Sequence, residues 1–170
     1  MIKRENLFIP NKMAYAKGER PAVDCILCEV AKGSDKVKNL EVARHGGFVI
    51  SANLYPYNPG HLMIFPHQHV EDPREFGDEE ALTLHRLTMT TMDCLGELYG
   101  AQAFNVGFNF GDVSGASLAH YHLHVVPRYA RENGFIDIVG GARIIVEDPN
   151  ETCRRVAQDL STRLAAREVS

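Results

Sequence analysis

Residues 120–128, HYHLHVVPR, restrict the fold more than any other segment of the chain. Histidine occupies every second position at its start, namely His120, His122 and His124. Side chains alternate between the two faces of a β-strand, so the pattern predicts a strand with three imidazoles on one face, directed into a cleft or an interface. The residues between them predict a buried opposite face: Tyr121, Leu123 and Val125.

The longest periodic pattern is helical. Apolar residues recur every three or four positions over 78–99, with Asp78 as the expected N-cap and Gly100 as the C-terminal stop. A short helix is expected through 28–32. A final helix begins at Pro149 and carries three apolar residues at helical spacing, Val156, Leu160 and Leu164.

Strand-like segments lie on both sides of the long helix. Apolar runs separated by turn-forming residues predict strands over 40–44, 48–51, 61–66, 103–110, 120–128 and 143–147. Short strands in succession, with one long central helix and one C-terminal helix, are typical of the α+β class. We therefore expect an α+β fold with an antiparallel sheet of about five strands, one face of which is covered by helix.

The composition is that of an ordinary globular protein. The chain has 170 residues, 45% of them hydrophobic and 24% charged, which favours one domain over 23–170 behind a polar N-terminal arm, residues 1–22. The net charge of −4 argues against long nucleic acid as a partner. No apolar run approaches the roughly 18 residues of a membrane span, so we expect a cytoplasmic protein without a membrane partner.

Three interpretations of the alternating histidines compete. They can decorate a solvated sheet face, or they can bind a metal ion. In the third interpretation one histidine is a nucleophile or general base, and the others orient it or bind elsewhere. Three alternate positions on a straight strand span too far for all three imidazoles to bind one ion.

The loop before the histidines favours the third interpretation. It is rich in glycine and in neutral hydrogen-bond donors, among them Asn109, Ser114, Gly115 and Ser117. Glycine lets main-chain N–H groups approach an anion closely, and hydroxyl and amide groups add further donors. The loop can therefore bind a phosphate group without lysine, which a metal site alone would not need.

The four cysteines are of two kinds. Cys25 and Cys28 form a C-x-x-C pair, which in a reducing compartment indicates a metal or redox site; a packed pair of buried cysteines is the alternative. Cys94 and Cys153 stand alone in helical patterns, and we expect them to be small buried residues.

The pattern of histidine and apolar residues over 120–126 resembles the signature of the histidine-triad nucleotide-binding family. The N-x-G run that begins at Asn105, the following Pro127-Arg128, and NPGHLMIFPHQH at 58–69 also resemble that family. The resemblance covers about Cys25 to Arg128. It implies the family's α+β fold and a nucleotide ligand, and we expect a homodimer.

The resemblance also implies catalytic roles. His122 would attack the α-phosphorus of a nucleotide and form a covalent intermediate, with His120 and His124 completing the triad. Four groups would hold the phosphate oxygens: His124, Asn109, Gly115 and Ser117.

The same resemblance assigns the nucleoside part of the ligand to the 53–60 turn. Asn53 would bind the ribose hydroxyls, with Leu54 against the base. An ordinary turn residue is the alternative for Asn53.

A zinc site is implied in the same way. Members of this family and the related galactose-1-phosphate uridylyltransferases bind zinc through such a cysteine pair and two histidines. Carried over, the ligands of a structural zinc ion would be Cys25, Cys28, His69 and His120. His67 is the rival of His69, and the other histidines are interpreted as surface or turn residues: His45, His61 and His85.

The expected activity is cleavage or transfer of a nucleotidyl group from a dinucleoside polyphosphate or similar nucleotide, with adenine as the expected base. Residues 128–149 partly resemble an extension found in diadenosine tetraphosphate phosphorylases, although Gly134-Phe135-Ile136 replaces Asn-Phe-Met there. The alternatives are a hydrolase of nucleotidyl phosphoramidates or sugars, a non-catalytic nucleotide-binding regulator, and a purely structural zinc module.

Overall fold

The computed structural model describes residues 20–111, 113–130 and 147–168 of the chain. Its elements follow in the order α2 (Ile26–Lys32), β1 (Glu41–His45), β2 (Phe48–Ala52), β3 (Leu62–Pro66), the 3-10 helix η1 (Pro73–Glu75), α3 (Asp78–Tyr99), β4 (Ala103–Gly107), β5 (Leu123–Arg128) and α5 (Pro149–Glu168). The expected α+β class is confirmed. Most of the expected arm, and the expected strand over 143–147 except Glu147, lie outside the described residues.

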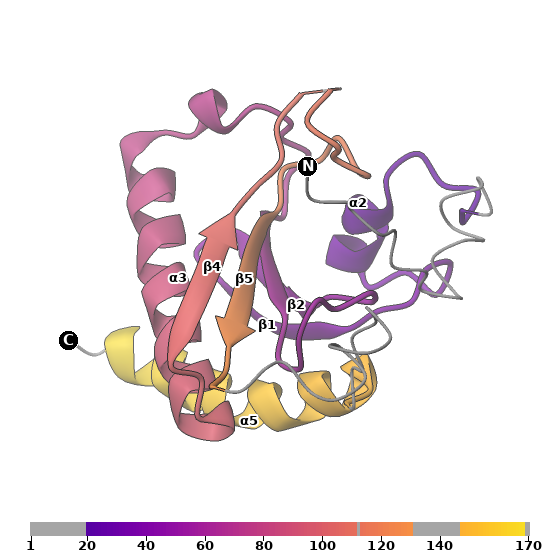
Figure 1. The fold of residues 1–170 in the computed structure, drawn as a ribbon. Coiled ribbons are helices and arrows are strands. Elements are labelled where there is room, and N and C mark those ends of the chain that lie inside the picture. Colours follow the sequence, from indigo (N-terminus) through magenta and orange to yellow (C-terminus); the bar gives the residue numbers. More distant parts are fainter. Residues whose placement is uncertain (1–19, 112, 131–146, 169–170) are drawn as a thin grey trace, which may run out of the picture.

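The five strands form one antiparallel sheet in the order β1-β2-β3-β5-β4 (Figure 1). The expected sheet of about five strands is thus confirmed. Strand β4 joins the sheet only through β5 and forms one of its two edges. It ends at Gly107, three residues before the predicted end of the strand.

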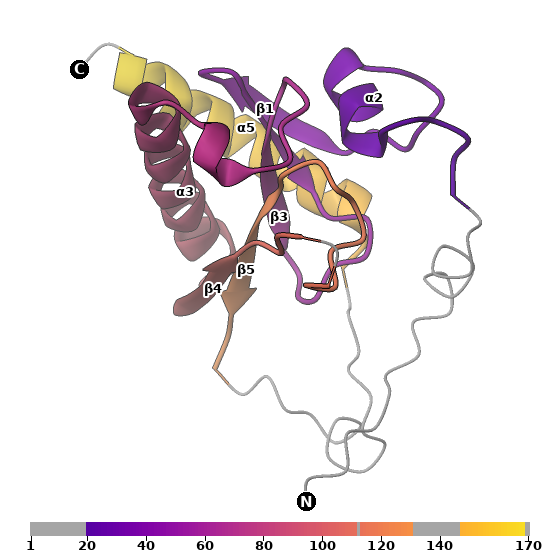
Figure 2. The same ribbon diagram turned by 90° about the horizontal axis from the view of Figure 1, so that it is seen from above.

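Helices cover both faces of the sheet, but unequally (Figure 2). The long helices α3 and α5 pack on one face, where the main core includes Ile50, Ile64 and Val125. The short helix α2 covers part of the other face, where a smaller core contains Leu27, Val49 and Phe65. Part of that second face therefore stays available for a site.

The ends of the long helix follow the sequence signals closely. Helix α3 covers residues 78–99 as predicted, and Gly100 ends it with a left-handed φ of 65°. The predicted N-cap at Asp78 is wrong by one residue: Gly77 occupies that position, and its N–H donates to the Glu80 carboxylate at 3.0 Å. No helix among the described residues is long and apolar enough to cross a membrane.

The predicted strand over 120–128 begins three residues late. Strand β5 starts at Leu123, because the Tyr121 N–H donates to the Val70 carbonyl at 2.7 Å and does not join the sheet ladder. The residues between the histidines, Tyr121, Leu123 and Val125, are buried as predicted. His120 and His122 are also buried, with exposed fractions of 1% and 4%, so their imidazoles do not face open solvent, and their direction into a cleft or an interface stays a prediction.

Candidate active site and metal centre

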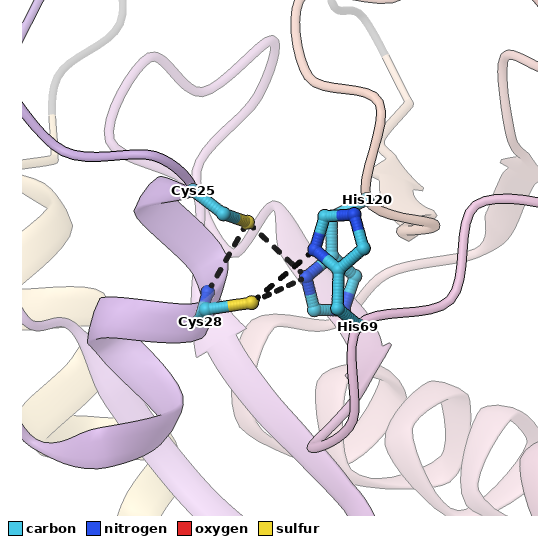
Figure 3. A group of neighbouring side chains, drawn as sticks. All are labelled: Cys25, Cys28, His69 and His120. Atoms are coloured by element: carbon cyan, nitrogen blue, oxygen red, sulfur yellow. Dashed lines mark hydrogen bonds between the residues drawn. The ribbon is translucent and has the colours of Figure 1, made fainter.

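Two cysteines and two histidines from three separate parts of the chain meet at the start of α2 (Figure 3). Their ligand atoms all lie within 4.8 Å of one another, and the residues are Cys25, Cys28, His69 and His120. The structure therefore brings together the four positions that the family resemblance implied. His67, the rival of His69, is exposed and is not in this group.

The separations within the group suit a small tetrahedral cation. The Cys28 sulfur lies 3.3 Å from His69 Nδ1 and 3.5 Å from His120 Nδ1, and the Cys25 sulfur lies 3.4 Å from His120 Nδ1. Metal bonds of about 2.0–2.3 Å arranged tetrahedrally place ligand atoms at roughly such separations. Two sulfurs and two nitrogens are also a common ligand set for structural zinc.

The outer nitrogens of both histidines are held in the way that metal ligands require. His120 Nε2 lies 3.0 Å from the Pro66 carbonyl oxygen, and His69 Nε2 lies 3.0 Å from a Glu71 carboxylate oxygen. Because both oxygens can only accept, each Nε2 carries the proton and donates it. Each Nδ1 consequently presents a lone pair to the two sulfurs, as in carboxylate–histidine–metal arrangements.

Without a cation the Cys28 thiol is held in its protonated form. Burial, followed by the neighbouring Cys25 thiol, raises the pKa of Cys28 to about 11. Burial lowers the pKa of His120 to about 4, so that its imidazole stays neutral at physiological pH. A neutral imidazole and a thiol that lacks a positive partner are the state that a divalent cation would convert into a ligand set.

A cavity of about 530 Å³ adjoins this group. The four candidate ligands line it together with residues from the N-terminal side of α2 and from the loop before the triad, including Arg20 and Ser117. The Arg20 guanidinium donates to the Ser117 carbonyl at 3.0 Å, which ties the two sides together. The lining does not include His122, so this cavity belongs to the metal group.

The middle histidine is oriented by the residue two positions before it. His122 Nδ1 lies 2.8 Å from the His120 carbonyl oxygen, which can only accept, so Nδ1 carries the proton. The other ring nitrogen, Nε2, therefore carries the lone pair of the neutral imidazole. Burial lowers the pKa of His122, which favours this neutral, nucleophilic form.

The structure corrects the interpretation of His61 as a surface or turn residue. Its side chain is 1% exposed, and its Nε2 lies 2.9 Å from His124 Nδ1. The turn residue Tyr57 stacks on the His61 ring with centroids 4.9 Å apart, and the His122 ring lies 4.9 Å from that of His124. His61 therefore joins His122 and His124 in one cluster of imidazoles, while the His120 ring lies in the metal group.

The tautomers of the His61 and His124 pair follow from one backbone group. The Tyr57 N–H donates to His61 Nδ1 at 3.1 Å, so that nitrogen carries no proton. A neutral His61 must then carry its proton on Nε2, from which it donates to His124 Nδ1. A neutral His124 that accepts this bond at Nδ1 carries its own proton on Nε2.

Asn53 lies beside this pair, as a ribose-binding residue would. Its Oδ1 accepts from the Tyr55 N–H at 2.9 Å, and its Nδ2 lies 3.3 Å from His61 Nε2. Leu54 follows in the turn with an exposed fraction of 43%. The expected ribose and base contacts thus lie next to the imidazoles.

The three loop residues expected to hold phosphate are exposed. Gly115 has a φ of 84°, a backbone conformation that favours glycine. Asn109 and Ser117 are solvent-accessible. Among the described residues, neither side chain forms a hydrogen bond to one of the imidazoles. The structure therefore leaves their role in phosphate binding as a prediction.

In the sequence, only the turn formed by Pro59, Gly60 and His61 (the PGH turn) could have drawn attention to His61. Gly60, directly before it, has a φ of 78°, and a side chain there would meet Leu95 at 3.2 Å. The turn is further held by the Asn58 side-chain amide, which donates to the Pro127 carbonyl at 2.6 Å. The conformation of Gly60 fixes the position of the next side chain, His61, so that it contacts His124 of the neighbouring strand.

Comparison with known proteins agrees with this site. The HIT domain model matches residues 36–131, more than half of the chain. Among curated relatives, the AP-4-A phosphorylase of Mycobacterium tuberculosis is 38% identical over 132 residues, which cover 77% of this chain and 67% of the relative. The adenosine 5'-monophosphoramidase of Schizosaccharomyces pombe is 26% identical over 113 residues, covering 66% of this chain and 80% of that protein.

Solved structures agree with the fold. A Zn-bound histidine triad family protein from Mycobacterium smegmatis superimposes with a TM-score of 0.68 at 21% identity, covering 84% of this chain and 97% of that one. At this identity the likeness concerns the fold alone. Together with the matched domain and the 38% identical relative, it confirms what the alternating histidines predicted: the chain belongs to the HIT family.

Proposed function

We propose that this chain is an enzyme that cleaves dinucleoside polyphosphates through a covalent intermediate on His122. The observation that carries the proposal is the complementary proton arrangement of two adjacent imidazoles. His122 has its lone pair on Nε2, and His124 has a donatable proton on its own Nε2. One ring can therefore attack phosphorus while the other donates a hydrogen bond to the group that leaves.

In the first step His122 Nε2 forms a bond to the α-phosphorus of the bound nucleotide. The bond between that phosphorus and the bridging oxygen breaks, and its electron pair goes to the departing oxygen. The departing phosphate group leaves as an anion, and the Nε2–H of His124 donates a hydrogen bond to its oxygen. His61, which donates to His124 Nδ1, keeps His124 in the tautomer that can do so. Neutral donors of the Gly115 and Ser117 loop would stabilise the charge on the phosphate oxygens.

In the second step an acceptor releases the nucleotide from His122. The acceptor's oxygen forms a bond to phosphorus while the N–P bond breaks and returns its electron pair to His122 Nε2, and any proton that the acceptor carried passes to solvent. The 38% identical AP-4-A phosphorylase supports inorganic phosphate as the acceptor. Water would give a hydrolase by the same steps.

The metal group would serve this chemistry from outside the reaction. A zinc ion bound there would supply a structural crosslink between the start of α2 and the segment that leads into β5. Cys25, Cys28 and His69 would hold it together with His120, whose carbonyl oxygen orients His122. The steps above are carried by the imidazoles alone.

Product analysis tests the proposal. The protein is incubated with diadenosine tetraphosphate, with and without inorganic phosphate, and the products are separated by ion-exchange chromatography. ATP and ADP formed only with phosphate indicate a phosphorylase, and ATP and AMP formed without it indicate a hydrolase. Absence of any product under both conditions would overturn the proposed activity.

The nucleophile is tested by His122→Ala, with His85→Ala as the matched control because His85 is exposed on α3. Loss of the nucleophile should lower turnover by about 10⁴-fold or more. AMP should still raise the melting temperature of the variant, because a ligand of the folded state stabilises it. Wild-type turnover in His122→Ala would exclude the covalent intermediate.

A second candidate activity is hydrolysis of nucleotidyl phosphoramidates, which the similarity to the S. pombe phosphoramidase favours. The two activities differ in the group that leaves phosphorus when His122 attacks, which is a nucleotide in one case and an amine in the other. The ratio of kcat/KM for diadenosine tetraphosphate to that for adenosine 5'-phosphoramidate decides between them. A ratio above one supports the polyphosphate assignment.

We also propose that the enzyme works as a homodimer joined along β4. This edge strand exposes Val106, and the segment after it exposes Phe108 and Phe110, each with an exposed fraction of 43% or 44%. An apolar, unpaired strand edge tends to pair with another strand. Light scattering after gel filtration should give twice the chain mass of 18.9 kDa, and Val106→Lys should shift the population to the monomer.

A further inference from the structure

The two strands next to the catalytic centre carry an arginine held by an asparagine. Arg128, the last residue of β5, donates from its guanidinium to the Asn105 side-chain oxygen in β4 at 3.0 Å. In the register of these strands Asn105 is opposite Val126, and Gly107 is opposite His124. Opposite residues of an antiparallel pair point to the same face, and residues two apart on one strand do so as well. Arg128 and Asn105 therefore share the face of His124.

The opposite face confirms this placement. Pro127, which lies next to Arg128 on β5, contacts the Gly60 and Leu95 side, where α3 packs. Arg128 alternates with it and so projects away from α3, toward the face that α2 leaves partly open. Both Arg128 and Asn105 are exposed to solvent there.

The charges of the sheet make this arginine distinctive. Among the strand residues, all of which the structure describes, only Arg44 and Arg128 are cationic. Arg44 lies in β1, at the far edge, and is paired with Glu41. The loop over 108–119 contains no lysine or arginine, and Arg20, which contacts its Ser117 carbonyl, lines the cavity of the metal group. The loop over 108–119 therefore offers only neutral donors of its own, with Arg74 lying over its Phe110 ring, and β5 supplies a cation farther along the sheet.

The distance from the centre assigns this cation to a particular part of a ligand. Arg128 follows His124 by four residues, which is about 13 Å along a strand. A phosphate held by His122 and His124 is thus remote from Arg128. A phosphate chain that continues from it along β5 would run toward the guanidinium.

We infer that Arg128, oriented by Asn105, binds the phosphates of the substrate that lie beyond the α-phosphate. This inference rests on the proposed function and names its specificity determinant. A guanidinium recognises phosphate oxygens through paired N–H donors, and the bond to Asn105 fixes the plane in which those donors lie. The site thereby selects long, highly charged nucleotides over nucleoside monophosphates.

Binding measurements test the inference independently of turnover. Titration calorimetry is carried out with the full chain carrying His122→Ala, so that no substrate is consumed, using diadenosine tetraphosphate and AMP as ligands. Adding Arg128→Gln to this variant should lower its affinity for diadenosine tetraphosphate by about 10- to 100-fold, the effect of losing a hydrogen bond to a charged group. AMP affinity should change by less than about twofold, within the scatter expected of a surface substitution.

Control variants separate recognition from folding. Arg86→Gln removes an exposed arginine on α3, across the sheet, and should change neither affinity. Asn105→Ala should also lower the affinity for diadenosine tetraphosphate, but by less than Arg128→Gln does. Arg128→Lys should bind the tetraphosphate more tightly than Arg128→Gln and less tightly than the protein with Arg128. Melting temperatures of all variants should match, since both side chains lie at the surface.

Two results would overturn the inference. Tetraphosphate affinity unchanged in Arg128→Gln would remove Arg128 from the binding site, and an equal loss for AMP would make its role structural. The proposed function fails by a different result, namely a wild-type protein that binds the tetraphosphate and forms no product. The two failures are therefore distinguishable.

Discussion

His61 and His124 are joined by a hydrogen bond of 2.9 Å across the boundary between the PGH turn and β5. The backbone N–H of Tyr57 sets its direction, because it occupies His61 Nδ1 and leaves Nε2 to donate. A turn that carries no reacting group thereby decides which nitrogen of His124 holds a proton. In the proposed mechanism, the hydrogen bond that His124 Nε2 donates to the leaving group depends on that choice.

Replacing His61 should therefore damage chemistry more than binding. We expect His61→Ala to lower kcat by about 10- to 100-fold, the usual effect of losing a partner that orients an active group. AMP affinity, measured by calorimetry, should stay within about twofold. His85→Ala is the matched control, and a kcat equal to the wild type in His61→Ala would separate His61 from the reaction.

The metal group predicts a stability that depends on zinc. One zinc ion per chain should be found by elemental analysis, and chelation should lower the melting temperature, because a ligand of the folded state contributes about 2.7 kcal/mol at a hundred times its Kd. Cys28→Ser should abolish zinc binding and reproduce the effect of chelation. Cys153→Ser removes a cysteine outside the group, so zinc content should not change.

The Glu71 carboxylate should strengthen zinc binding through His69. It accepts from His69 Nε2 at 3.0 Å, and loss of such a partner commonly weakens metal affinity by about 10- to 100-fold. Glu71→Gln should show this in a competition titration with a chromophoric chelator. Glu75→Gln, a nearby exposed carboxylate outside the group, should leave the affinity unchanged.

Gly60 should tolerate no side chain. Its φ of 78° is costly for other residues, and an added Cβ would meet Leu95 at 3.2 Å. We expect Gly60→Ala to lower the free energy of unfolding by about 1–3 kcal/mol in urea titrations. Gly33 has a similar φ of 70° with nothing near its missing Cβ. Gly33→Ala should therefore cost less, and equal costs would mean that contact with Leu95 is unimportant.

The pair of Asp159 and Arg163 predicts one element of the acid sensitivity. The hydrogen bond from Arg163 lowers the pKa of Asp159 below its ordinary value of 3.8. Such a group stabilises the fold at pH above 3.8, and its contribution is lost as pH falls through the lower, folded-state value. Asp159→Asn should cost roughly 0.5–1 kcal/mol at pH 7. The difference from the wild type should shrink toward pH 2.5 in urea titrations, and a gap that widened in acid would contradict this account.

Sequence reasoning worked best where several local signals agreed. Helix α3 was predictable over its full length because an apolar stripe lay between an acidic first turn and Gly100. The metal group was predictable because the family resemblance carried four competent ligand types, Cys25, Cys28, His69 and His120, at matching positions. In both cases no long-range packing had to be inferred.

Sequence reasoning failed where tertiary contacts overrode local pattern. The alternation of His120 and His122 predicted a strand. However, the His120 imidazole bonds to the Pro66 carbonyl and the Tyr121 N–H bonds to the Val70 carbonyl, so that the pairing of β5 starts only after these residues. His61 was misread because a histidine after glycine in a turn is ordinarily exposed. Only the three-dimensional approach of the turn to β5 shows its partner.

The phase of segment 120–128 limits how this protein can diverge. One residue inserted after His122 would move each following side chain of β5 to the opposite face of the sheet. His124 would then point toward α3, and Val125 would leave the core. Metal ligand, attacking ring and proton donor could not then be kept together. Changes in length are easier to accommodate over residues 108–119 than over the nine residues 120–128 that follow.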